Sequence, residues 1–98
     1  PIYMAYVYPR LAAAQRVAKA LGLPRPESSQ RDGKKLYVVY NGKTIHFGAR
    51  AYSDYLEHKD KERRARYRLR ARGALLANGL PAYMDRRQPA YYAYRILW

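Results

Sequence analysis

The sequence contains no cysteine, only two histidines and only seven acidic residues among its 98 positions. Without cysteine, the chain can form neither a disulfide nor a thiolate zinc site. A metal site would need histidines and carboxylates, which are scarce, so we expect no bound metal and no other cofactor. No apolar run approaches the roughly 18–20 residues that a membrane-spanning helix needs. We therefore expect a soluble protein that works inside a cell or inside an assembled particle.

Candidate catalytic residues are also scarce. A nucleophilic triad needs a serine or cysteine beside a histidine that a carboxylate orients. Ser53, Asp54 and His58 lie close in sequence, but their spacing is typical of a helix cap followed by a charged turn. The tripeptide Gly42-Lys43-Thr44 matches the end of a phosphate-binding loop and lacks the upstream glycine. We expect no catalytic residue and predict that the protein is not an enzyme.

Positive charge is the strongest feature of the composition. Twenty lysines and arginines stand against seven acids, which gives a net charge of +13, and most of the cations are arginine. A GC-rich coding bias would explain arginine in place of lysine, but it would not explain the net charge. Arginine carries a planar, permanently charged fork that suits phosphates and stacks on bases or aromatic rings. The charge therefore predicts association with nucleic acid or another acidic surface.

The first third of the chain is expected to form a strand and a helix. Residues 2–8 are rich in β-branched and aromatic side chains, which favour a strand that ends at Pro9. Residues 10–21 place alanine, leucine and valine on one stripe at helical spacing, which predicts an amphipathic helix. Gly22 is suited to end this helix. Residues 24–33 are polar and rich in turn formers, which predicts an exposed loop.

Residues 34–50 carry the clearest structural signal, that of a β-hairpin. Two β-rich segments flank Asn41-Gly42, a pair that tolerates the positive φ angles of a type I′ turn. Asp54 is placed to cap the helix that follows, and Glu57 then occupies the capping-box position. A bend near residues 58–60 would separate this helix from the next one.

Residues 61–76 predict a long basic helix. Cations occupy every even position over residues 64–72, which is the period of a strand, but the surrounding residue types favour a helix by intrinsic propensity. A narrow apolar seam of Ala65, Leu69 and Leu76 would seat this helix on the sheet.

The last segment, residues 80–98, is aromatic and interrupted by Pro81 and Pro89, so residues 90–98 fit either a short helix or an edge strand. Its apolar end should dock on the domain. Tyrosine supplies 12 of the 14 aromatic residues of the chain, and each buried tyrosine needs a partner for its hydroxyl. Since tyrosine is enriched at protein interfaces, part of the tail is predicted to form one. The predicted interface aromatics are Tyr83, Tyr91, Tyr92, Tyr94 and Trp98.

The basic helix supplies the predicted polyanion-binding surface. Residues 59–72 hold eight cations and two acids, so the charges cannot neutralise one another along the helix as they do on an ordinary solvated face. On a helical wheel the cations form two stripes. The first stripe is Lys59, Arg63, Arg66 and Arg70, and the second is Lys61, Arg64, Arg68 and Arg72. If about six of them met phosphates, binding would weaken steeply with salt, with a log–log slope of roughly −5.

Residues 34–72 resemble a family of small, basic, uncharacterised proteins encoded by nucleocytoplasmic large DNA viruses. That family shares a hairpin of the form K-Y-x-V-x-x-x-G-K-x-I-x-F-G, followed by Y-S-D-[FY] and H-K-D-x-x-R-x-x-R-Y. A tail usually rich in tryptophan is here rich in tyrosine, and residues 2–22 have no counterpart. The resemblance implies a viral protein, packaged in the virion, and implies no catalytic residue. The matching residues are Lys35, Tyr37, Val39, Gly42, Lys43, Ile45, Phe47, Gly48, Tyr52, Ser53, Asp54, Tyr55, His58, Lys59, Asp60, Arg63, Arg66 and Tyr67.

These features together predict a small single α+β domain over residues 1–98. It would contain an N-terminal strand and helix, an antiparallel β-hairpin, a basic helix and a docked aromatic C-terminal tail. The predicted function is that of a non-enzymatic virion or minor-capsid-associated structural protein, which binds neighbouring virion proteins and possibly nucleic acid. An alternative is a DNA-binding protein that condenses the genome through residues 59–72, and a weaker one is a ribosomal protein. The expected location is the virion, and the host cytoplasm or nucleus during assembly.

Overall fold

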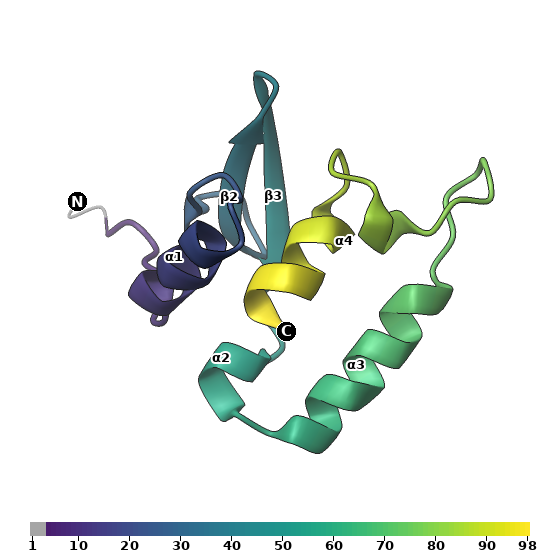
Figure 1. The fold of residues 1–98 in the computed structure, drawn as a ribbon. Coiled ribbons are helices and arrows are strands. Elements are labelled where there is room, and N and C mark those ends of the chain that lie inside the picture. Colours follow the sequence, from purple (N-terminus) through teal and green to yellow (C-terminus); the bar gives the residue numbers. More distant parts are fainter. Residues whose placement is uncertain (1–3) are drawn as a thin grey trace.

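The computed structural model describes residues 4–98 and has the predicted α+β architecture, with a three-stranded antiparallel sheet and short helices (Figure 1). The strands lie in the order β1-β2-β3. None of the helices in the described part of the chain is long and apolar enough to cross a membrane. The elements are α1 (Leu11–Ala20), β1 (Glu27–Ser28), β2 (Lys34–Tyr40), β3 (Lys43–Ala49), α2 (Tyr55–His58), α3 (Lys61–Gly73), η1 (Ala82–Met84), α4 (Pro89–Tyr92) and η2 (Ala93–Leu97).

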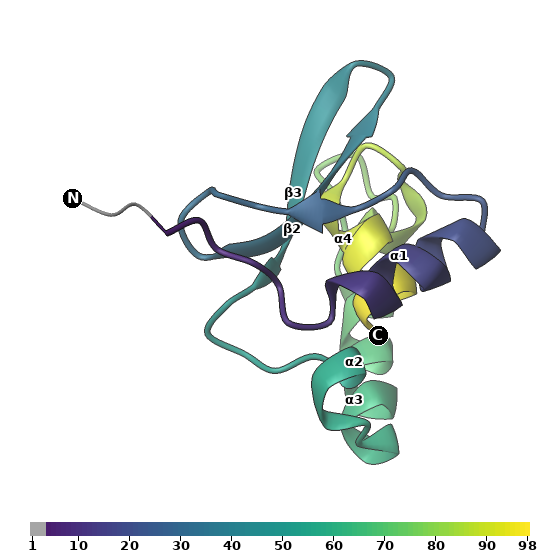
Figure 2. The same ribbon diagram turned by 90° about the vertical axis from the view of Figure 1, so that its left-hand side faces the viewer.

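The β-hairpin is confirmed. Tyr40 pairs with Lys43 across the turn, and both turn residues have positive φ, 50° at Asn41 and 76° at Gly42. Both turn residues therefore adopt the positive φ angles that a type I′ turn requires. Figure 2 shows the tip of the hairpin extending away from the helices. One side of the hairpin is buried, and its side chains are those of Leu36, Val38, Ile45 and Phe47.

The N-terminal strand is a wrong prediction. Residues 2 and 3 lie outside the described part of the chain, and residues 4–8 are irregular. The main-chain N–H groups of Tyr6 and Tyr8 donate to side chains, to Gln30 Oε1 and Ser28 Oγ at 2.9 Å each, instead of to a strand. The edge strand is β1, which lies inside the segment that was predicted to be a loop. Helix α1 is confirmed; it ends at Ala20, and Gly22, whose φ is +68°, follows the C-cap residue Leu21.

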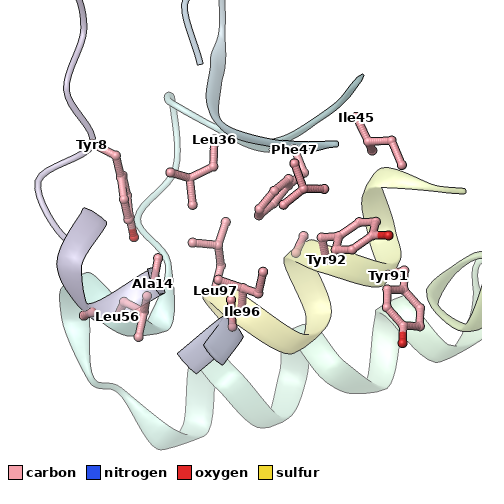
Figure 3. Packing of buried hydrophobic residues seen from close by; sticks show 14 residues of the cluster. Tyr8, Ala14, Leu36, Ile45, Phe47, Leu56, Tyr91, Tyr92, Ile96 and Leu97 are labelled. Atoms are coloured by element: carbon pink, nitrogen blue, oxygen red, sulfur yellow. The ribbon is translucent and has the colours of Figure 1, made fainter. Parts of the chain in front are cut away.

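The C-terminal tail packs against the sheet and completes the core, as predicted. Figure 3 shows Tyr92, Ile96 and Leu97 beside Phe47 of β3, and the ring centroids of Phe47 and Tyr92 are 5.9 Å apart. The tail is helical over α4 and η2, so the alternative of an edge strand is wrong. Tyr91 and Tyr92 are buried, which corrects their assignment to an interface.

Helix α3 does not lie on the sheet. It has no buried residue, Ala65 is exposed and Leu69 is 72% exposed, so the predicted apolar seam is wrong. The helix also ends at Gly73, before Leu76. Figure 1 shows the C-terminal segment lying between α1 and α3. The helix therefore meets the tail instead of the sheet.

The tail comes close to the hairpin at Gly48. Its φ is +82°, and a Cβ atom there would lie 2.9 Å from Leu97 Cδ1 and 3.1 Å from Lys35 Cβ. We expect Gly48→Ala to lower the free energy of unfolding by about 2–4 kcal/mol, from backbone strain and overpacking together. Urea denaturation measures this loss. Gly33→Ala is the matched control, since Gly33 has a φ of +76° and open space around it. The control should lose about 1 kcal/mol, and equal losses would contradict the close approach.

Candidate nucleic-acid interface

Carboxylates cap the two helices on either side of the bend, α2 and α3. The Asp54 carboxylate accepts the N–H of Glu57 at 3.1 Å, and the Glu57 carboxylate accepts the N–H of Asp54 at 3.2 Å, so the predicted capping box is confirmed. The chain then turns at Lys59, which has a left-handed φ of 57°. Asp60 starts the next helix by accepting two N–H groups, at 3.0 and 3.1 Å. Its pKa lies below the ordinary value, chiefly because of these backbone bonds.

A buried ion cluster connects the hairpin to this bend. The ammonium group of Lys35 donates to Asp54 Oδ2 at 2.8 Å, to Glu57 Oε1 at 2.7 Å and to the Tyr52 carbonyl at 2.6 Å. The Lys35 side chain is only 4% exposed. The Tyr8 hydroxyl also donates to Asp54 Oδ2, at 2.6 Å, and burial together with this bond raises the pKa of Tyr8. Asp54 is thus fully occupied inside the domain.

The residues considered for catalysis do not come together. His58 Nδ1 accepts the N–H of Asp60 at 2.8 Å, and Asp54 is held by Lys35 and Tyr8. A Ser29 Oγ–His46 Nδ1 contact of 2.7 Å exists elsewhere, but Ser29 is fully buried, so a substrate has no access to its hydroxyl. Among residues 4–98, no three His, Asp or Glu side chains gather as a metal site would require.

The second cationic stripe attaches helix α3 to the rest of the domain. Arg68 Nη2 donates to the Trp98 main-chain oxygen at 2.8 Å, and Arg72 Nε donates to the Tyr94 hydroxyl at 2.9 Å. The Arg64 guanidinium lies 4.2 Å from the centre of the Tyr55 ring, a cation–π contact. Three of the four cations of this stripe are therefore used within the domain; the fourth, Lys61, is exposed.

The first stripe faces a cleft between α3 and the hairpin. Arg63, Arg66 and Arg70 line one wall of this cavity, whose volume is about 440 Å³. Lys59 was predicted to join them but lies at the bend, with its ammonium 5.6 Å from the Tyr55 ring. Within residues 4–98, the one carboxylate within 4.0 Å of the three guanidinium groups is Glu62, at 4.0 Å from Arg66 on the surface. Such an exposed pair neutralises little charge.

The rest of the cleft lining combines cations with aromatic and apolar groups. Trp98 stacks on Tyr67 with a centroid distance of 4.3 Å and an interplanar angle of 8°. Asp54 is the one carboxylate among the lining residues, and Lys35 already neutralises it. The cleft is therefore net positive. The remaining lining residues are Lys34, Lys35, Gly48, Ala49, Tyr52, Ser53, Ala93 and Leu97.

Lys34, Tyr52 and Tyr67 are among the lining residues that sequence reasoning did not assign to a site. Tyr67 lies on the same helical face as Arg63 and Arg70, which was a usable signal. Nothing in the sequence placed Lys34 or Tyr52 opposite that face. Of the predicted interface aromatics, Tyr83, Tyr94 and Trp98 are partly exposed.

A model of a family of unknown function, DUF5754, matches residues 27–71. The match covers a little under half of the chain. The matched segment contains the hairpin, the capping residues Asp54 and Asp60 and the first stripe. It does not include α1 or the C-terminal tail with Trp98. No curated protein and no solved structure matches the chain. The viral resemblance and the function it implies stay predictions.

The ion cluster should dominate stability. Lys35→Met keeps the apolar stem and leaves the Asp54 carboxylate buried without its cation, so we expect a loss of about 3–5 kcal/mol in the free energy of unfolding. Urea denaturation followed by circular dichroism measures it. Lys34→Met is the control, because Lys34 is only partly buried and makes no ion pair within the described residues. The control should change stability by less than about 0.5 kcal/mol, and similar losses for the two variants would argue against the cluster.

The same cluster should make stability depend on acid pH. Burial alone would raise the pKa of Glu57, but hydrogen bonds from Lys35 and from Asp54 outweigh it and hold the pKa below its ordinary value of 4.5. A lowered pKa in the folded state adds stability above pH 4.5 that is lost as the pH falls through the folded value. The stability difference between the wild type and Glu57→Gln should therefore shrink below pH 4.5. The exposed Glu62→Gln serves as control, and a difference that is constant with pH would refute the assignment.

Proposed function

We propose that this chain is a non-enzymatic protein that binds the phosphate backbone of nucleic acid through the cleft. The observation that supports the proposal most directly is the placement of Arg63, Arg66 and Arg70 on one wall, with Lys34 among the other lining residues. Arginine forks pair with phosphate oxygens in two parallel hydrogen bonds, which makes such a cluster suited to a polyanion.

The electrostatics of the site supports a ligand from outside the domain. Arg63, Arg66 and Arg70 repel one another at their helical spacing. The described part of the chain offers them no buried acid as a partner. A bound polyanion would remove this repulsion, whereas the arginines of the second stripe already have partners. We therefore assign binding to about four cations instead of eight.

The setting that we propose is the particle of a large DNA virus, where the protein would contact the packaged genome. This part rests on the resemblance of residues 34–72 to the viral family. Of the functions expected from the sequence, DNA binding becomes the leading proposal. Cations of the first stripe line one cleft, whereas two of the predicted interface tyrosines, Tyr91 and Tyr92, lie in the core.

A structural role between neighbouring virion proteins remains the second proposal. Its support is a set of exposed large apolar side chains on α3, in the loop that follows it and in η1. An apolar surface of this kind is typical of a protein contact. The residues are Leu69, Leu75, Leu80 and Met84.

The test of the first proposal is a triple variant, Arg63→Gln, Arg66→Gln and Arg70→Gln. We expect at least a tenfold loss of affinity for a DNA oligonucleotide in 100 mM salt, since three phosphate contacts disappear. The log–log salt slope should be about −3 for the wild type and should move towards zero by about 2 in the variant. Fluorescence anisotropy across a salt series measures both quantities.

A matched control removes the same charge elsewhere. Arg16→Gln, Lys19→Gln and Lys43→Gln lower the net charge by three at exposed positions outside the cleft. If the cleft is the site, this control keeps most of the affinity. Equal losses in the two triple variants would show that net charge alone drives binding and would sink the proposal.

A further inference from the structure

Arg63, Arg66 and Arg70 line the cleft and are at the same time exposed to solvent. The exposed face of the helix also presents Ala65, Leu69, which is 72% exposed, and the acidic Glu62, which lies 4.0 Å from Arg66. A helix that reads a duplex enters the major groove with its basic face outward. If α3 entered a groove, the acidic Glu62 and the apolar Ala65 and Leu69 would meet the DNA together with Arg66. This arrangement disfavours a duplex as the ligand.

The cleft combines charge with apolar surface. Its cations are carried by α3 and by the start of β2, while Gly48, Ala49, Ala93 and Leu97 are small or apolar lining groups. The stacked pair Tyr67–Trp98 adds aromatic surface, and Tyr52, which is 71% exposed, adds a ring that is accessible from solvent. A ligand that complements this lining carries both negative charge and a flat apolar ring.

We propose that the cleft holds one unpaired nucleotide of a single strand, with its base against the aromatic and apolar lining and its flanking phosphates on the arginines. This inference rests on the proposed function and narrows it from nucleic acid in general to single strands. Base stacking on aromatic side chains beside a cationic groove is the usual way in which proteins hold single strands without reading a sequence. The volume of about 440 Å³ suits one nucleotide, whereas a duplex cannot enter a recess of this size.

An acidic peptide is the other class of ligand that a positive cleft attracts. The aromatic lining favours the nucleotide, because acidic side chains carry no flat ring to stack there. The arginines also favour the nucleotide. Each guanidinium can form two parallel hydrogen bonds with a phosphate, and in a strand a phosphate lies on either side of each nucleotide. Poly-glutamate therefore serves as a competitor in the test.

Trp98 provides a direct readout, since it is the only tryptophan of the chain and lines the cleft. We expect a short oligothymidine to quench its fluorescence and to bind at least tenfold more tightly than a blunt hairpin duplex with the same number of phosphates. Pyrophosphate should bind weakly and leave the emission nearly unchanged. Equal affinity for duplex and single strand, no quenching by the oligothymidine, or displacement of it by poly-glutamate at equal charge would overturn the inference.

Variants of Tyr52 test this inference separately from the proposed function. Tyr52→Ala should weaken oligothymidine binding by about tenfold, because it removes a stacking surface, and should leave heparin binding unchanged. Tyr52→Phe keeps the ring and should bind like the wild type. If the triple arginine variant loses binding while Tyr52→Ala does not, the polyanion site stands and the nucleotide pocket falls. If the triple variant binds normally, both fall.

Discussion

The ammonium group of Lys35 lies where the hairpin, the bend and the N-terminal segment meet. It holds the carboxylates of two capping residues, Asp54 and Glu57, and Tyr8 closes the cluster from the other side. Burying a charge is costly unless every partner is in place, so the cluster tolerates only one arrangement of these segments. Helix α3 starts a few residues further on, and the position of the first stripe across the cleft follows from that arrangement.

Tyrosine and arginine, which dominate the composition, serve the interior as much as the surface. Tyr92 is buried and donates its hydroxyl to the Arg86 carbonyl at 2.7 Å, which resolves the need of a buried tyrosine for a partner. Arginines also stack on rings, with Arg95 3.6 Å from the centre of Tyr91 and Arg50 3.8 Å from that of Tyr6. A high arginine content therefore overstates the charge available to a ligand. About half of the cations in the basic helix are free to bind one.

The parts of the fold that local chemistry decides could be predicted. Asn41-Gly42 dictates a turn, and a carboxylate three residues before a second one, as in Asp54 and Glu57, marks a helix start. Residues 2–8 favoured a strand by composition, but in the described part the backbone donors of Tyr6 and Tyr8 find side-chain acceptors. Local propensity contains no information about such distant partners.

The candidate site was only half predictable for the same reason. A helical wheel separates two cationic stripes, but it cannot show which of them the C-terminal tail will contact. The answer depends on Trp98, which is 31 positions from Tyr67 in the sequence and stacks on it in the fold. The prediction of an apolar seam was wrong because the tail, and not the sheet, lies beside α3. Leu69 therefore stays exposed.

The joint between helix α3 and the tail has a further consequence. It consists of one stacked ring pair and a few arginine contacts, and among the described residues Arg68 Nε and His58 Nε2 are buried there without a hydrogen-bond partner. Each such atom costs about 1–3 kcal/mol. The helix has no buried residue of its own to offset this. We therefore expect helix α3 to open about the bend at Lys59 at a lower free energy than global unfolding, while the sheet stays intact.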